Sequence, residues 1–320
     1  MFMCSGHGPA AARRAATALL LAGCIAATAN AQDYGDPPYV QTPRNIVDKM
    51  LELARLQAGD FVIDLGSGDG RMVIAAAKEY GARGFGVDLD ARLVRLANAN
   101  AVKAGVADRV KFYQRDLYDT DISRANAVTL YLLPEVNLMV RAKLLDTLRP
   151  GTRVVSHDYD MGRWHPDYQT ELKAPGKTVG AVKTSKIFYW VVPAIAAGHW
   201  YWKLAQDGRP VVFDLTLDQM FQKLTGALTI DGVPATLESA TLDGSRLHLV
   251  AATDAGSTPT RYQFSGKIIN HAIEGEAQIV RGESRHKMTW KAARIEAWDP
   301  RHFAFRDTPP CQEMSVPCGR

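Results

Sequence analysis

The first part of the chain alternates short apolar runs with longer stretches in which apolar residues recur at helical spacing. Residues 61–65 (FVIDL) are largely apolar, as in a strand covered on both faces, and residues 72–80 (MVIAAAKEY) carry an alanine-rich face that predicts a helix. Further strands are predicted within residues 84–88, 110–117, 128–132, 152–155 and 185–194. Strands and helices in this alternation predict an α/β fold with a mainly parallel sheet.

From residue 198 onward the helical spacing disappears, and polar and apolar residues alternate in short runs. Three Asp-Gly pairs, which favour tight hairpin turns, separate some of these runs: Asp207-Gly208, Asp231-Gly232 and Asp243-Gly244. We predict an antiparallel all-β domain of about eight strands over residues 198–298, either a sandwich or a barrel, with an irregular tail at 299–320. Its role stays open between substrate binding, packing beside a catalytic cleft and dimerisation.

The N-terminal segment, residues 1–31, has the pattern of a signal peptide. Arg13 and Arg14 precede an apolar core at residues 15–28, and Ala29-Asn30-Ala31 forms a small-x-small cleavage site. We therefore expect an exported protein, periplasmic or secreted, with no stable membrane span after cleavage. A lipoprotein anchored through Cys24 is less favoured, because apolar residues continue past that cysteine.

Charge and cysteine content exclude some classes of function. The net charge is only +4, and two arginines of the leader contribute to it, so nucleic-acid binding has no electrostatic support. Beyond the leader the cysteines are Cys311 and Cys318, which we expect to form a disulfide in an oxidising compartment. A metal site is not expected, because no pair of histidines accompanies these cysteines.

A glycine-rich turn follows the first predicted strand. Gly66, Gly68 and Gly70 allow a sharp turn and a close approach to a ligand, and Asp69 is predicted to cap the helix that follows. Asp88 ends the next strand about 20 residues later, where a carboxylate can accept both ribose hydroxyls of an adenosine. The spacing G-x-G-x-G, with no Gly-Lys-Ser/Thr after it, disfavours NAD and ATP.

The run DLGSGDGR at residues 64–71, followed by MVIAAAK, resembles the first motif of class I S-adenosylmethionine (SAM) methyltransferases. It is most like the branch that holds the mitochondrial ATP-synthase-c and adenine-nucleotide-translocase lysine methyltransferases, with their bacterial relatives that carry signal peptides. The likeness covers residues 38–195 and includes YVQTP at 39–43, which is similar to the family's Tyr/Phe-Val-Pro segment. It implies a Rossmann-like, seven-stranded class I methyltransferase sheet and SAM as the cofactor.

The resemblance also implies roles for individual residues. Asp64 would organise the ammonium group of SAM, Asp88 its ribose, and Asp116 its adenine amino group, although Asp116 is alternatively a solvated acid at a strand end. The complete implied cofactor-binding set is Tyr39, Thr42, Asp64, Gly66, Ser67, Gly68, Asp88, Leu89, Asp116, Leu117 and Tyr131.

The methyl acceptor should lie at the carboxyl edge of the sheet, where open α/β folds place their ligands. The catalytic candidates that follow the fourth and fifth predicted strands are Tyr131, Glu135 and Asp158. Two structural alternatives stay open: Glu135 caps a helix at 136–148, and the acids after the fifth strand form a salt bridge with Arg163. The Asn/Asp-Pro-Pro-Tyr/Phe motif of amine-modifying branches is absent.

The favoured hypothesis is methyl transfer from SAM to an amine acceptor, a protein lysine first and a small molecule second. Because the sulfonium is already activated, positioning a neutral amine in line carries most of the catalysis. The rival hypothesis is an exported SAM- or nucleoside-binding module without catalysis, since SAM is made in the cytosol. The pattern does not set the oligomeric state.

Overall fold

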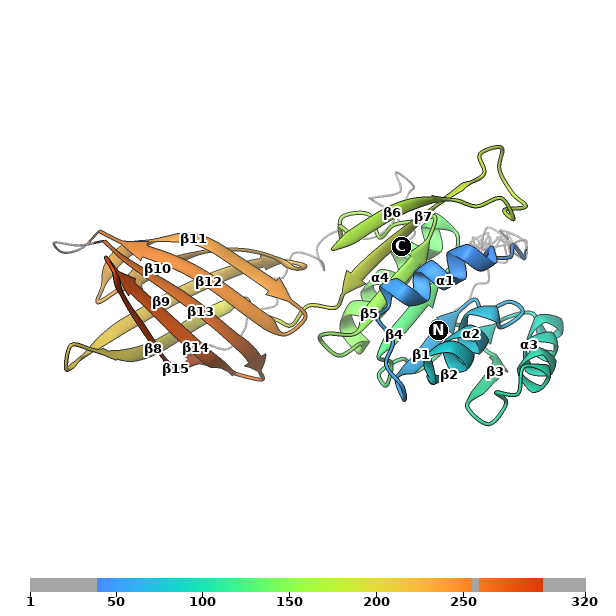
Figure 1. Cartoon of the computed structure of the whole chain (residues 1–320), viewed down its shortest axis with the longest axis horizontal. Coiled ribbons are helices and arrows are strands. Elements are labelled where there is room, and N and C mark those ends of the chain that lie inside the picture. Colours follow the sequence, from blue (N-terminus) through green and yellow to red (C-terminus); the bar gives the residue numbers. More distant parts are fainter. Residues whose placement is uncertain (1–38, 255–258, 296–320) are drawn as a thin grey trace, which may run out of the picture. The chain divides into compact units, whose positions relative to one another are not determined.

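The computed structural model describes residues 39–254 and 259–295 (Figure 1). The expected leader at 1–31, its Cys24, and the Cys311–Cys318 pair lie outside these described residues. Within the described ranges, none of the helices is both long and apolar enough to span a membrane.

Seven strands form one mixed sheet in the order β3-β2-β1-β4-β5-β7-β6. The strands are β1 (Phe61–Leu65), β2 (Arg83–Asp88), β3 (Val110–Gln114), β4 (Ala127–Leu130), β5 (Arg153–His157), β6 (Tyr168–Lys173) and β7 (Thr184–Val191). The pairs among β1 to β5 are parallel, and β7 is antiparallel to both β5 and β6. The chain order reverses between β1 and β4, so their carboxyl ends open onto the crevice where such sheets bind ligands. The predicted seven-stranded α/β sheet is confirmed.

Helices cover both faces of this sheet. They are α1 (Arg44–Leu53), α2 (Arg71–Tyr80), α3 (Ala91–Lys103) and α4 (Pro134–Thr147). On one face, buried residues of α1 and α2 pack with Val62 and Val155. On the other face, buried residues of α4 pack with Ile63 and Val128. Val62 and Ile63 follow each other in β1, and successive side chains of a strand point to opposite faces of the sheet. In the described part, the segments after β3 and β5 are turns and loops rather than helices.

The start of α2 differs in detail from the prediction that Asp69 caps this helix. The N-cap position is Gly70, with a left-handed φ of 82°, and it makes no side-chain capping bond. Asp69, one residue earlier, accepts a hydrogen bond from the first helical N–H, that of Arg71, at 3.3 Å. Its carboxylate also accepts from the Arg71 guanidinium, with Nη2 at 2.6 Å and Nε at 2.9 Å, so it contacts the helix end and pairs with the cation there.

Eight further strands form a closed antiparallel barrel, drawn in yellow to red in Figure 1. They are β8 (Gly198–Gln206), β9 (Arg209–Met220), β10 (Lys223–Ile230), β11 (Val233–Asp243), β12 (Arg246–Thr253), β13 (Thr260–Ile269), β14 (Ala272–Arg281) and β15 (Ser284–Arg294). Alternate residues point inward, and the core holds large aromatic side chains, among them Trp200, Trp202, Phe213 and Phe264. The predicted all-β fold is confirmed, as a barrel rather than a sandwich.

Two of the three Asp-Gly pairs make hairpin turns as predicted, whereas Asp243 ends β11 in register with Arg246, so that the third turn is Gly244-Ser245. Asp207 and Gly208 have φ values of 50° and 79° between β8 and β9, and Asp231 and Gly232 have 50° and 80° between β10 and β11. Positive φ at both central residues is the type I′ turn, whose twist matches that of the flanking strands.

Candidate active site

The glycine loop between β1 and α2 needs glycine for two separate reasons. Gly66, Gly68 and Gly70 all have positive φ, at 78°, 53° and 82°, where an L side chain is strained. A Cβ on Gly66 would also collide with the Leu132 side chain, and one on Gly68 with the ring of Tyr39. The loop therefore requires glycine at these positions, both for its backbone conformation and for the packing of Leu132 and Tyr39 against it.

Asp88, at the end of β2, is tied directly to this loop. Its Oδ2 accepts a hydrogen bond from the Gly68 N–H at 2.8 Å, and its Oδ1 accepts one from the Asp90 N–H at 2.9 Å. The N–H groups of Gly66 and Ser67 both donate to the Val87 carbonyl oxygen at 2.9 Å. The loop and the acid predicted to act together thus form one hydrogen-bonded unit.

Asp64 is a buried carboxylate with little compensation for its charge. It is only 6% exposed, and the Thr129 hydroxyl donates to its Oδ1 at 2.6 Å. Among the described residues no cationic side chain pairs with it, and burial raises the pKa of Asp64 to about 7. The Ser67 Oγ, three residues on, is buried and, in the described part of the chain, has no hydrogen-bond partner.

The second part of the site lies at the carboxyl ends of β4 and β5. Asp158 has a left-handed φ of 62°, its side chain is 12% exposed, and its Oδ2 lies 2.7 Å from Lys177 Nζ. The Tyr131 hydroxyl donates to the same oxygen at 3.4 Å. Burial raises the pKa of the Tyr131 phenol, and the negative charge of Asp158 raises it further. Asp158 and Tyr131 are called the amine cluster below, and Lys177 is the lysine bound at it.

His157 connects the amine cluster to the segment before α1. It is fully buried, its Nδ1 hydrogen-bonds with Thr42 Oγ1 at 3.2 Å and its Nε2 with Ser185 Oγ at 2.8 Å, and its ring lies against that of Tyr131 with 3.9 Å between centroids. Burial lowers the pKa of His157 to about 4, so the imidazole is neutral at pH 7. The Thr42 carbonyl in turn accepts from Arg71 Nη1 at 2.7 Å. Thr42 therefore links the glycine loop to the amine cluster.

Leu89 directly follows Asp88, and the Arg115 N–H, next to Asp116, donates to the Asp88 carbonyl oxygen at 3.1 Å, so Leu89 and Asp116 adjoin the glycine-loop group. Glu135 is exposed in the first turn of α4, whose N-cap is Leu133, and it makes no capping bond. Leu89 is 62% exposed, and Leu117 is half-buried against the sheet core. Asp116 is half-buried and its Oδ1 accepts from the Tyr118 N–H at 2.8 Å.

The expected salt bridge to Arg163 is wrong for Asp158. Its carboxylate pairs with Lys177, which the loop between β6 and β7 brings to the end of β5. Thr129 was not among the predicted site residues, although a lone hydroxyl within the apolar strand β4 (AVTL) indicates a buried hydrogen-bond partner. Lys177 carries no such indication, because the loop around it has no regular pattern.

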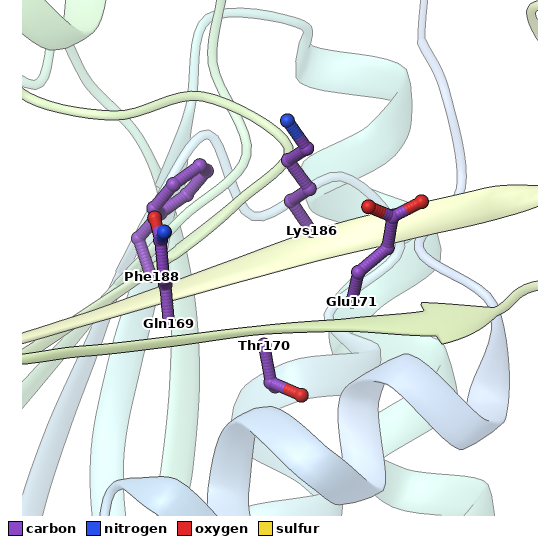
Figure 2. Close-up of a pocket in the computed structure, with 5 residues that line it drawn as sticks. All are labelled: Gln169, Thr170, Glu171, Lys186 and Phe188. Atoms are coloured by element: carbon purple, nitrogen blue, oxygen red, sulfur yellow. The ribbon is translucent and has the colours of Figure 1, made fainter.

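A hollow on the β6–β7 hairpin adjoins the amine cluster. Its volume is about 310 Å³, and its lining residues are Gln169, Thr170, Glu171, Lys186 and Phe188. Figure 2 shows the side chains of Glu171, Lys186 and Phe188 on one side of the hairpin and that of Thr170 on the other. The Lys186 N–H donates to Asp158 Oδ1 at 3.0 Å. Lys186 therefore both lines the hollow and contacts the amine cluster.

Comparison with known proteins finds methyltransferases. Residues 64–168 match the ANTKMT methyltransferase domain. A protein-lysine N-methyltransferase from Saccharolobus islandicus (strain REY15A) is 44% identical over 130 residues, which are 40% of this chain and 81% of that protein. The adenine nucleotide translocase lysine N-methyltransferase of Mus musculus is 37% identical over 40% of this chain and 56% of that protein, so the chain spans little more than half of that relative.

A solved structure is also similar to part of the chain. The RNA methyltransferase from Salinibacter ruber in complex with S-adenosyl-L-homocysteine is 50% identical, covering 48% of this chain and 94% of that one, with a TM-score of 0.44.

The seven-stranded sheet with its reversed β7, together with the glycine loop and Asp88, defines a class I SAM-dependent methyltransferase. SAM is the cofactor of this class. The chain belongs to the ANTKMT methyltransferase family, as the 44% identity over 81% of the Saccharolobus islandicus protein shows.

Proposed function

We propose that this enzyme transfers the methyl group of SAM to the ε-amine of a lysine side chain in an acceptor protein. One observation carries the choice of acceptor: the amine cluster already binds a lysine ammonium group, with Lys177 Nζ 2.7 Å from the Asp158 carboxylate. The relatives named as lysine methyltransferases support the same acceptor.

The residues of the glycine loop fit SAM. Asp64 is a buried carboxylate without a cationic partner in the described part of the chain, and the methionine portion of SAM carries an ammonium group that would compensate its charge. Asp88 accepts two backbone N–H groups and, as a carboxylate, has further lone pairs for ribose hydroxyls. Among the described residues, Ser67 offers an unpartnered hydroxyl beside them.

When bound, SAM supplies a methyl group that its sulfonium activates for transfer to a nucleophile. The acceptor amine attacks this carbon, so an N–C bond forms while the S–C bond breaks, and S-adenosylhomocysteine leaves. The work left to the protein is to bind the ammonium group, remove a proton and align the amine. Asp158 serves the first two tasks, since a carboxylate holds the ammonium and passes its proton to water. The Tyr131 hydroxyl orients the carboxylate by donating to its Oδ2.

The hollow beside the cluster suits a polypeptide acceptor. It lies along the exposed hairpin of β6 and β7 and offers an apolar ring at Phe188 and a carboxylate at Glu171. We expect the chain on either side of an acceptor lysine to bind along this hairpin, which is tied to Asp158 through the Lys186 N–H.

The proposed function is tested by transfer of label from tritiated SAM to proteins of an envelope extract. We expect labelled protein lysines, with labelling reduced well over tenfold by Asp88→Ala and unchanged by Asp108→Ala, whose side chain is 75% exposed. Binding of SAM without any transfer would favour the binding-module hypothesis, and label in small molecules alone would favour the other alternative.

We also propose that the protein is exported, on the pattern of residues 1–31 alone. Mass spectrometry of the native protein should find Gln32 at its N-terminus and a disulfide between Cys311 and Cys318. A diacylglyceryl group on Cys24 would instead show export as a lipoprotein, and would overturn cleavage after Ala31.

A further inference from the structure

Lys177 places its ammonium group beside Asp158, at the carboxyl ends of β4 and β5 where we expect the acceptor to bind. Its side chain is 15% exposed, that of its partner Asp158 is 12% exposed, and Nζ also donates to the Thr184 carbonyl oxygen at 2.8 Å. A primary ammonium is thus held by one carboxylate and one carbonyl, next to a tyrosine hydroxyl. These are the groups that would receive an incoming lysine.

The loop at residues 174–183 turns this lysine inward. Ala174 is buried and its N–H donates to the Lys183 carbonyl at 2.7 Å, while the Lys177 N–H donates to the Ala174 carbonyl at 2.9 Å. Gly176 faces Pro43, the residue after Thr42, so the loop lies against the same segment that contacts the glycine loop. The loop that carries Lys177 and the start of α2 therefore both contact the segment at Thr42 and Pro43.

Stability alone is a weak explanation for this ion pair. Removing two charges from water is costly, and their attraction recovers this cost only with good geometry, so buried pairs are often neutral relative to apolar residues. The pair also lies at a residue with positive φ, Asp158, where the backbone is strained. The desolvation of the ion pair and the backbone strain at Asp158 both occur where an acceptor amine has to bind.

We infer that Lys177 is an internal stand-in for the acceptor lysine, which occupies the amine cluster in the resting enzyme and is itself methylated when no acceptor displaces it. The inference rests on the proposed function, because it takes the amine cluster to be the acceptor site. It adds a modification site and a competitor to that function.

The methylation of Lys177 follows the same balance as transfer to an external acceptor. The ammonium loses one proton, through the Asp158 carboxylate to water, and the freed lone pair forms the N–C bond. The S–C bond of SAM breaks, its electron pair stays on sulfur, and S-adenosylhomocysteine leaves. Displacement of Lys177 by an acceptor lysine exchanges one ammonium for another at the same carboxylate.

Occupancy is tested without any cofactor, by measuring binding of N-acetyl-lysine methylamide to the full-length protein by calorimetry. If Lys177 covers the site about nine-tenths of the time, Lys177→Met should bind the probe about tenfold more tightly than the wild type. Lys177→Arg keeps a cation beside Asp158 and should bind as weakly as the wild type. Lys173→Met, on the same hairpin, and the uncharged probe N-acetyl-norleucine methylamide are the matched controls.

Modification is tested on the unaltered protein, so the result does not depend on a variant that folds. After incubation with SAM and no acceptor, peptide mapping by mass spectrometry should show methyl groups on Lys177 and none on Lys173 or Lys183. Addition of envelope proteins should lower this modification as they are methylated in its place.

The outcomes separate the inference from the proposed function. Methylated acceptor proteins with an unmodified Lys177, or equal probe binding by the wild type and Lys177→Met, would overturn the inference and leave the function standing. No labelled protein of any kind would contradict the proposed function, and the cofactor-free binding comparison would then still decide whether Lys177 covers an amine site.

Discussion

The hydroxyl of Thr129 on β4 donates a 2.6 Å hydrogen bond to the carboxylate of Asp64 at the end of β1. The two residues are register neighbours across the point where the strand order of the sheet reverses. The bond fixes the direction of the carboxylate without neutralising its charge. The unliganded protein therefore holds an acid whose pKa is raised by burial to about 7 and which a bound cation would return to its ionised form.

Substitution of Asp64 by asparagine should stabilise the unliganded protein at alkaline pH. An acid with a folded pKa near 7, above its ordinary value of 3.8, destabilises the fold progressively as pH rises from about 4 to above 7. Asp64→Asn removes this cost, up to about 4 kcal/mol at pH 8 and close to nothing at pH 4. Thermal unfolding at both pH values checks the prediction, and an equal shift at both would contradict it.

Cofactor binding should depend on the same carboxyl group, but here its ionised form is the favourable one. The ammonium of S-adenosylhomocysteine needs an ionised Asp64, so its affinity should rise as pH increases from 6 to 8 and then level off. Calorimetry in buffers of different ionisation enthalpy should detect proton release on binding below pH 7. Asp64→Asn should weaken binding at least tenfold and abolish both effects; a wild-type affinity that is flat with pH would refute the role given to Asp64.

Gly68→Ala should abolish cofactor binding and also destabilise the fold. The new Cβ lies at a φ of 53° and against the Tyr39 ring, so the loop must move. Gly59→Ala is the matched control, because Gly59 has a φ of 86° but no atom within 4 Å of the added carbon. Each substitution carries a backbone cost of about 1–2 kcal/mol. Only Gly68→Ala should lose S-adenosylhomocysteine binding, and equal binding by the two variants would be the contrary result.

His157 should make the protein sensitive to acid. Its pKa is lowered to about 4 from 6.5, so the stability it contributes is present above pH 6.5 and is lost as pH falls toward 4. The loss corresponds to about 3 kcal/mol. His157→Gln should flatten the stability profile between these pH values, as followed by urea unfolding, whereas the exposed His165→Gln should leave it unchanged. An unaltered acid limb in His157→Gln would show that the buried imidazole is not its source.

Local pattern was enough to predict most elements. The helix expected at 72–80 is α2 (Arg71–Tyr80), and each alternating run after residue 198 lies in one barrel strand, because periodicity depends on which face is buried. The same alternation occurs in sandwiches and barrels, so closure through β8 and β15 was not predictable.

One part of the candidate site was predictable from local sequence, and the other part was not. Asp64, Gly68 and Asp88 lie within one strand-turn-helix-strand unit whose motif is local, and the structure brings them together. Asp158 and Lys177 meet only because a long hairpin loop folds back onto the end of β5. A pairing of that kind leaves no trace in local spacing, and for the same reason Arg163, the nearer cation in sequence, was a wrong partner.

The barrel closes through a short seam. β14 and β15 share ten register pairs, whereas β15 and β8 share two, Ala293 with Tyr201 and Arg294 with Trp200. Every other contact between neighbouring barrel strands joins strands that are consecutive in the chain. In kinetic terms, the hairpins can form early from local contacts, whereas the seam must wait for the loop-closure entropy of the whole barrel. Hydrogen exchange should therefore be fastest along β8 and β15, where this barrel both finishes folding and first opens.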